Sequence, residues 1–130
     1  MRNITKGKVL IIFDPHQDVG YLNKCIELDS DFDHLIFGGD FFDTFKTPDG
    51  KNIYGVTQMC EWINEKLEEL GDKATWLSSN HDIAYLASYT KDYTKTKPNP
   101  YYNCSGWTRS KAKSINKTIN PEYWNKMEMC

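Results

Sequence analysis

Three short apolar runs, each followed at once by polar residues, restrict the possible folds of this chain more than any other feature. They are residues 8–13 (KVLIIF), 34–37 (HLIF) and 74–77 (ATWL). Short continuous runs of this kind are typical of strands in a parallel sheet that is covered on both faces. Between them lie helical patterns at about Val19–Leu28 and 54–70, the second closed by Gly71 as C-cap. The order predicts an α/β fold with a β-α-β-α-β parallel sheet.

The last third of the chain continues this pattern less regularly. A further helix is expected to begin within Ile83–Ala87, and residues 88–106 are expected to form a surface loop. Two helices should follow, a basic one over 106–119 and one over 120–130 that opens with Asn120 as N-cap and Pro121 at its first position. No repeat is visible, which predicts a single domain over 1–130 with a basic loop and helical insert over 88–130.

Charge is unevenly distributed along the 130 residues. Residues 1–90 hold 15 acidic and 8 basic side chains, whereas residues 91–130 hold 3 acidic and 8 basic ones. A basic tail can attract phosphates and nucleic acid, although a solvated surface has the same composition.

The cysteines argue for a reduced protein without a disulfide framework. Cys25, Cys60, Cys104 and Cys130 stand 35, 44 and 26 residues apart, so no C-x-x-C pair is present. Free thiols fit a reducing cytosol. The apolar run near the N-terminus is too short for a signal or membrane segment, and a cytoplasmic protein without membrane contact is expected.

Residues able to bind metal ions or move protons follow each apolar run. Asp14 and His16 follow the first, Asp40 and Asp43 the second, and Asn80, His81 and Asp82 the third. Each has a structural explanation when taken alone, because Asp-Pro opens turns, Gly-Gly-Asp ends strands and Asn-His-Asp caps helices. Parallel strands, however, bring their carboxyl ends to one edge of the sheet, where ligands bind. The sequence therefore predicts one shared site.

The residue types in this predicted site favour a pair of divalent metal ions. Asp14 and His16 are two residues apart and would point the same way in extended backbone, so that they hold one ion together. Asp40 can bridge to a second ion, with Asn80 as a neutral oxygen ligand. Mixed oxygen and nitrogen donors suit manganese, iron or zinc better than calcium. Two such ions promote phosphoester hydrolysis.

Two further side chains complete the predicted chemistry. His81 is the expected general acid for the leaving oxygen, and Asp43 is the expected partner that orients its ring. Gly38 and Gly39 would let the backbone pass close to the ions.

The three blocks together resemble the calcineurin-like metallophosphoesterases. They are D-P-H (14–16), G-D-F-F-D (39–43) and N-H-D (80–82), and the stretch CSGWTRSKAKSINKTINPEYWNKM resembles an insert of bacteriophage-type members. The resemblance implies that Asp14, His16 and Asp40 bind the first metal and that Asp40 and Asn80 bind the second. It also implies that His81 is the catalytic histidine, with Asp43 as its partner. The implied fold is the first half of a four-layer α/β/β/α sandwich.

The chain departs from the family pattern at several positions. Ser79 stands where the third block usually opens with glycine, and Thr44 and Asp82 replace the arginine and glutamate typical of the protein phosphatases. The family also supplies metal-binding histidines from a carboxyl-terminal half, whereas this chain has only His16, His34 and His81. His34 is expected to be structural.

These departures lead to two expectations about the chain as a whole. It is either the amino-terminal part of a longer enzyme or a short member that lost activity or borrows ligands. Without the second sheet, apolar surface should remain uncovered, and a homodimer or partner subunit could cover it.

Three functions follow from the sequence. The leading one is a metal-dependent phosphoesterase acting on phosphate mono- or diesters. The first alternative is a nuclease of the same family, with the basic tail binding nucleic acid. The second is an inactive or ligand-borrowing scaffold protein that retains the fold.

Overall fold

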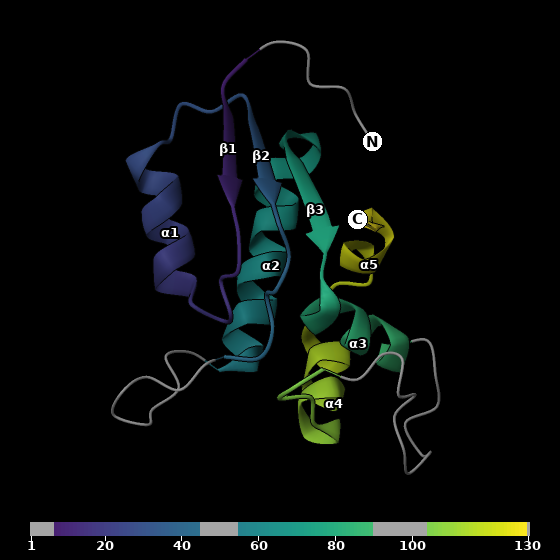
Figure 1. Cartoon of the computed structure of the whole chain (residues 1–130). Coiled ribbons are helices and arrows are strands. Elements are labelled where there is room, and N and C mark those ends of the chain that lie inside the picture. Colours follow the sequence, from purple (N-terminus) through teal and green to yellow (C-terminus); the bar gives the residue numbers. More distant parts are fainter. Residues whose placement is uncertain (1–6, 45–54, 90–103, 130) are drawn as a thin grey trace, which may run out of the picture.

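Four parallel strands form one sheet whose spatial order, β1-β2-β3-β4, is also their order along the chain. Figure 1 shows β1, β2 and β3 side by side. The computed structural model describes residues 7–44, 55–89 and 104–129. The strands are β1 (Val9–Ile12), β2 (His34–Phe37), β3 (Ala74–Ser78) and β4 (Met127–Met129). In the sheet register, Ile36 lies opposite Ile11 on one side and Thr75 on the other. The predicted α/β class with a parallel sheet is confirmed.

The helices follow the predicted apolar periodicity. They are α1 (Val19–Leu28), α2 (Val56–Leu70), α3 (Asn80–Tyr89), α4 (Arg109–Thr118) and α5 (Glu122–Lys126), with a 3-10 turn, η1 (Gly71–Lys73), after α2. The Asp18 side chain caps α1 by accepting from the N–H of Tyr21, and Gly71 ends α2 with a φ of 50°. Helix α3 begins before Ile83, because the Ser79 carbonyl already accepts from the Ile83 N–H.

The carboxyl end of the chain differs from its prediction as a single helix over 120–130. Helix α5 ends at Lys126, and β4 then pairs in parallel with β3, with Met127 opposite Trp76. The Asn120 side chain does accept from the N–H of Glu122, as expected of a helix start. Of the expected loop over 88–106, residues 90–103 lie outside the described part.

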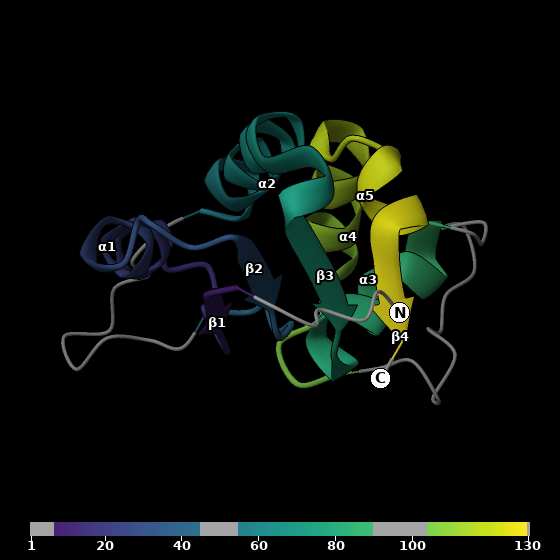
Figure 2. The same ribbon diagram turned by 90° about the horizontal axis from the view of Figure 1, so that it is seen from above.

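Within the described part of the chain, the helices cover one face of the sheet. When each strand lies beside its predecessor and the connections are right-handed, all crossovers fall on the same side. Figure 2 shows α1, α2 and α5 on that side. The covered face is apolar and aromatic, with Phe37 and Trp76 stacked at 4.3 Å between ring centroids. On the opposite face Ile11 is 49% exposed, so the expectation that β1 is covered on both faces is wrong, while the expected uncovered apolar surface is present.

Three further features of the described part concern its thiols, the length of its helices and His34. Cys25, Cys60 and Cys104 are free cysteines. None of the helices over 7–44, 55–89 and 104–129 has both the length and the apolar character needed to span a membrane. His34 begins β2, is buried, and forms a hydrogen bond to Thr75 Oγ1 with its Nε2 at 2.8 Å, which is a structural role at the far end of the strands.

Candidate metal-binding and acid–base site

The loops that follow β1 and β2 have a strained backbone. Of the described residues other than glycine, five have positive φ: Asp14 (50°), His16 (41°), Gln17 (63°), Asp40 (61°) and Asp43 (67°). Such residues are uncommon and persist where the surrounding structure holds them, often at functional sites. Four of the five are predicted site residues. The expectation that Asp14 and His16 point the same way in extended backbone is wrong, because both residues lie in the left-handed region.

Hydrogen bonds between these two loops continue the pairing of β1 and β2 beyond the strand ends. The N–H of His16 donates to the carbonyl of Asp40, and the N–H of Gln17 donates to the carbonyl of Phe41, both at 2.9 Å. The buried side chain of Gln17 accepts from the N–H of Asp43 at 3.0 Å. The strained loops therefore support one another.

Asp14, His16 and Asp40 converge at this edge of the sheet. One possible ligand atom from each lies within 4.8 Å of the others. His16 Nδ1 lies 2.9 Å from the carbonyl oxygen of Asp43. Because a carbonyl can only accept, Nδ1 carries the proton, and Nε2 is the ring atom with a lone pair. Nε2 lies 4.0 Å from Asp40 Oδ2, a separation too long for a hydrogen bond.

These three side chains fit a divalent metal ion. Two carboxylates and one imidazole are donors suited to manganese, iron or zinc. A histidine that binds metal commonly donates its other ring N–H to a carbonyl or carboxylate, which fixes the tautomer, and His16 does this through Asp43. Asp14 is exposed and the other two are half-buried, so the cluster is accessible from solvent.

Asp82 and Ser79 hold the Asp40 loop in place. Asp82 is fully buried and accepts from the N–H groups of Asp40 at 2.8 Å and Phe41 at 3.1 Å. Burial raises the pKa of Asp82 to about 6, although these backbone hydrogen bonds act in the opposite direction. Ser79 Oγ accepts from the N–H of Asp40 at 2.8 Å and also contacts Asp40 Oδ1.

Sequence reasoning placed Asp82 among the candidate residues at the strand ends and noted Ser79 as a departure from the family pattern, but it gave neither residue a role in holding Asp40. A usable signal existed, because Asp82 follows Ser79 by three residues, the spacing of a capping box, and its carboxylate accepts from the Ser79 N–H at 3.2 Å. Ser79 is not among the described residues with positive φ, so the glycine usual in the family is not required there.

Gly39 is required by close approach as well as by conformation. Its φ is 92°, and a Cβ at this position would lie 2.9 Å from both the N and the Cβ of Ser79. At Gly38 a Cβ would instead meet the ring of Phe13, a half-exposed side chain. The two glycines thus let the loop pack against Ser79 and Phe13.

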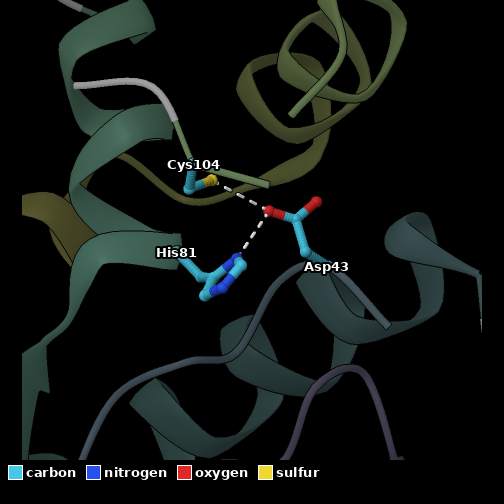
Figure 3. A group of neighbouring side chains, drawn as sticks. All are labelled: Asp43, His81 and Cys104. Carbon is cyan, nitrogen blue, oxygen red and sulfur yellow. Dashed lines mark hydrogen bonds and ion pairs between the residues drawn. The ribbon is translucent and has the colours of Figure 1, made fainter. Parts of the chain in front are cut away.

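The Asp43 carboxylate is the centre of a buried hydrogen-bond network (Figure 3). It is 4% exposed and accepts from four side chains. His81 Nδ1 at 3.0 Å and Cys104 Sγ at 3.1 Å approach Oδ2, whereas Tyr85 OH and Lys111 Nζ, both at 2.5 Å, approach Oδ1. Burial by itself would raise the pKa of Asp43, but the four hydrogen bonds outweigh it and hold this pKa below its usual value.

Cys104 and Tyr85 donate to Asp43 as neutral groups. Burial and the adjacent carboxylate raise the pKa of the Cys104 thiol to about 12 and raise the pKa of Tyr85 further above its usual value. Sequence reasoning missed Tyr85, Cys104 and Lys111. They come from α3, from the turn before α4 and from α4 itself, and no local pattern marks them.

Asp43 also links the two parts of the site. Its main-chain carbonyl orients His16, and its carboxylate orients His81. The rings of His16 and His81 are 5.3 Å apart between centroids and nearly perpendicular, at 81°. The predicted acid–base pair therefore lies next to the predicted metal ligands. Asn80, the remaining predicted ligand, is exposed at the first residue of α3, between Ser79 and His81.

Two groups of side chains in the described ranges are close enough to hold a metal ion: Asp14, His16 and Asp40, and separately Asp43, His81 and Cys104. Either group could therefore hold a metal ion. No protein-family model, no curated protein and no solved structure matches the chain.

Proposed function

We propose that the chain is a metal-dependent phosphoesterase that hydrolyses phosphate mono- or diesters. The observation that carries this proposal is the double role of Asp43, whose carbonyl fixes the tautomer of His16 and whose carboxylate holds His81. Asp43 thus connects the metal-ligand cluster to the acid–base pair. Turns that only connect strands to helices would not require such a connection. On this proposal the sheet corresponds to the first half of the metallophosphoesterase sandwich.

The proposed metal ligands are the four that the sequence predicted. Asp14, His16 and Asp40 would hold one ion, and Asp40 with Asn80 would contribute to a second. When bound, such ions polarise the phosphoryl group and supply a hydroxide nucleophile near neutral pH. Manganese, iron and zinc are the candidates that suit these donors.

The protein side chains would handle the leaving group. Asp43 is ionised at neutral pH, so its Oδ2 accepts the Nδ1 proton of His81. This leaves His81 Nε2 as the atom that delivers a proton to the leaving oxygen, while the Asp43 carboxylate stabilises the positive ring. Asp82 and Ser79 keep Asp40 in position through its N–H.

The incomplete second ligand set supports a second candidate, a scaffold or ligand-borrowing protein. Of the predicted ligands only Asp40 and Asn80 would remain for a second ion, and three or more protein ligands are usual in catalytic metal sites. A second chain could supply the remainder. The exposed apolar face around Ile11 and Phe13 offers a surface for a homodimer or a partner subunit.

The position of α4 supports including nucleic acid among the substrates. Lys111 reaches Asp43 from this helix, and Arg109, Lys113 and Lys117 belong to the same helix with exposed side chains at 109, 113 and 117. Positive charge close to a phosphoesterase site favours a polyanionic diester. The nuclease alternative is tested by adding a short oligonucleotide to the substrate panel.

The deciding experiment measures manganese-stimulated hydrolysis of an aryl phosphate monoester, an aryl diester and the oligonucleotide. The purified chain is compared with Asp40→Asn and His81→Ala, and Asp31→Asn is the matched control because Asp31 lies on the exposed surface, away from the site. Metal content and sedimentation are measured on the same samples.

Metal-dependent turnover that survives in Asp31→Asn and is lost in the other two variants would support the proposal. Folded, metal-loaded protein without turnover on any of the three substrates would refute it and favour the scaffold. Turnover confined to the dimeric fraction would show that the ligands are shared between chains.

A further inference from the structure

The second residue group, Asp43, His81 and Cys104, has a donor set unlike that of the first. It combines a carboxylate, an imidazole and a thiol, all buried and with ligand atoms within 4.8 Å of one another. The proposed phosphoesterase chemistry uses Asp43 and His81 but gives no role to Cys104. A thiol that converges with an imidazole is a donor pair favoured by zinc and other soft divalent ions.

The local backbone holds the thiol in this position. The carbonyl of Cys104 accepts from the N–H of Trp107 at 3.2 Å, which closes a turn with Gly106 at a φ of 88°. A Cβ on Gly106 would lie 3.2 Å from both Cβ and Cγ of Asp43, so only glycine lets the turn pack this closely. The Cys104 side chain is thereby directed at Asp43 Oδ2 (Figure 3).

The existing hydrogen bonds already bring the imidazole and the thiol to the same carboxylate oxygen. His81 Nδ1 and Cys104 Sγ both approach the same oxygen, Asp43 Oδ2, at 3.0 and 3.1 Å. Two ligands on a tetrahedral zinc ion lie only a little further apart than this, because zinc bonds are about 2.0 to 2.3 Å long. An ion can therefore take the place of the two shared protons after a small outward movement of the ligands.

The other oxygen of the carboxylate would remain occupied. Tyr85 and Lys111 donate to Asp43 Oδ1, and hydrogen bonds of this kind orient a carboxylate that binds metal through one oxygen. Lys111 adds a positive charge that opposes the ion, while the Asp43 carboxylate and the Cys104 thiolate together balance the two charges of zinc. A water molecule would supply the fourth ligand, as in zinc sites with three protein ligands.

We propose that Asp43, His81 and Cys104 form a second, inhibitory metal site for zinc or a similarly soft divalent ion. Binding of the metal to the protein with His81 as imidazolium releases two protons to solvent, one from Cys104 Sγ and one from His81 Nδ1. The neutral ring keeps its remaining proton on Nε2, and bonds form from the metal to Sγ, Nδ1 and Asp43 Oδ2. With a metal on Nδ1, the His81 ring cannot carry two protons and cannot act as an imidazolium acid. The inhibition rests on the proposed phosphoesterase function, whereas the metal site itself does not.

Cobalt(II) titration of the full chain tests the site without any activity. Cobalt bound to a thiolate absorbs in the near ultraviolet through charge transfer from sulfur, and the Asp14, His16 and Asp40 cluster contains no thiol to contribute to this band. The wild-type protein and Cys25→Ser, the matched cysteine control, are expected to show the band with an amplitude that corresponds to one thiolate-bound cobalt ion per chain. Cys104→Ser should lose it, and zinc should displace cobalt in the wild type.

Absence of the band in the wild type, or its persistence in folded Cys104→Ser, would overturn the metal site. If Cys104→Ser does not fold, the wild-type titration still decides, and Cys104→Ala serves as the second variant. Where turnover is measurable, zinc should abolish it in the wild type and require at least a tenfold higher concentration in Cys104→Ser. Unchanged turnover at zinc saturating the site would overturn the inhibition, while a cobalt band without any turnover would refute only the phosphoesterase.

Discussion

Replacing Asp43 with asparagine is the most informative single change, because it keeps the shape of the side chain and removes its charge. In the wild type, four side chains donate to the two carboxylate oxygens of Asp43. The amide oxygen of asparagine would turn toward His81 and Cys104, which leaves the amide nitrogen facing Tyr85 and Lys111.

The magnitude follows from what these last two groups can do. The Tyr85 oxygen can rotate its proton away and accept, but Lys111 has no acceptor and must leave. Lys111 is 29% exposed, so water recovers part of its loss. One displaced, partly solvated ammonium and several weakened hydrogen bonds amount to about 2 to 3 kcal/mol of unfolding free energy.

Urea unfolding of the metal-free protein measures this loss. With a urea dependence of about 1.5 kcal/mol per molar, the midpoint should fall by about 1.3 to 2 M at pH 7.5. The native pKa of Asp43 lies below its ordinary value of 3.8, so its ionised form contributes stability above that pH. This contribution is lost as the pH falls through the native pKa, and the difference between wild type and Asp43→Asn should shrink below pH 4.

Asp31→Asn is the matched control, since it also removes an aspartate charge, at the exposed surface. It should leave the midpoint nearly unchanged. A shift below about 0.5 M in Asp43→Asn, or a shift that does not depend on pH, would refute the conclusion that Asp43 is ionised and satisfied by four donors.

Three further predictions test the loops and the core. Gly39→Ala should cost at least about 2 kcal/mol of unfolding free energy, because it adds both backbone strain and a clash with Ser79. Gly38→Ala should cost less, since the Phe13 ring can turn away. Equal losses of the two variants in urea unfolding would contradict this. Asp82 has a native pKa of about 6, above its ordinary 3.8, so its ionisation between pH 4 and 7 lowers the stability by about 3 kcal/mol. The stability of wild type relative to Asp82→Asn should fall over that range, and a constant difference would argue against a buried charge. Phe37→Ala removes a buried ring and should lower the unfolding free energy by about 3 to 5 kcal/mol. Phe13→Ser, at a side chain that is 55% exposed, should lower thermal stability much less. A reversed order would mean that the face bearing Phe13 is covered.

The sequence predicted the fold well wherever an element carried its own boundary signals. Helix α1 and strand β2 match their predicted limits because turn residues flank a clear apolar pattern. Strand β4 was missed, since three residues after a helix carry no strand signal and its pairing depends on the exposed edge of β3.

The candidate site was predictable by residue type but not by geometry. The topology of parallel strands was enough to bring Asp14 and Asp40 to one edge of the sheet. The left-handed backbone at Asp14 and His16 was not predictable from their spacing, because it depends on hydrogen bonds to the next loop. Lys111 lies 68 residues from Asp43, and only the packing of α4 brings the two together.

On the proposed function, the left-handed backbone at Asp14 implies a conflict between stability and activity. An exposed aspartate with a φ of 50° carries strain that glycine would not. If Asp14 is kept as a metal ligand, Asp14→Gly should leave the fold as stable as wild type or more stable, while removing the ligand. The chain would then retain a less favourable residue for the sake of its chemistry, as enzymes commonly do.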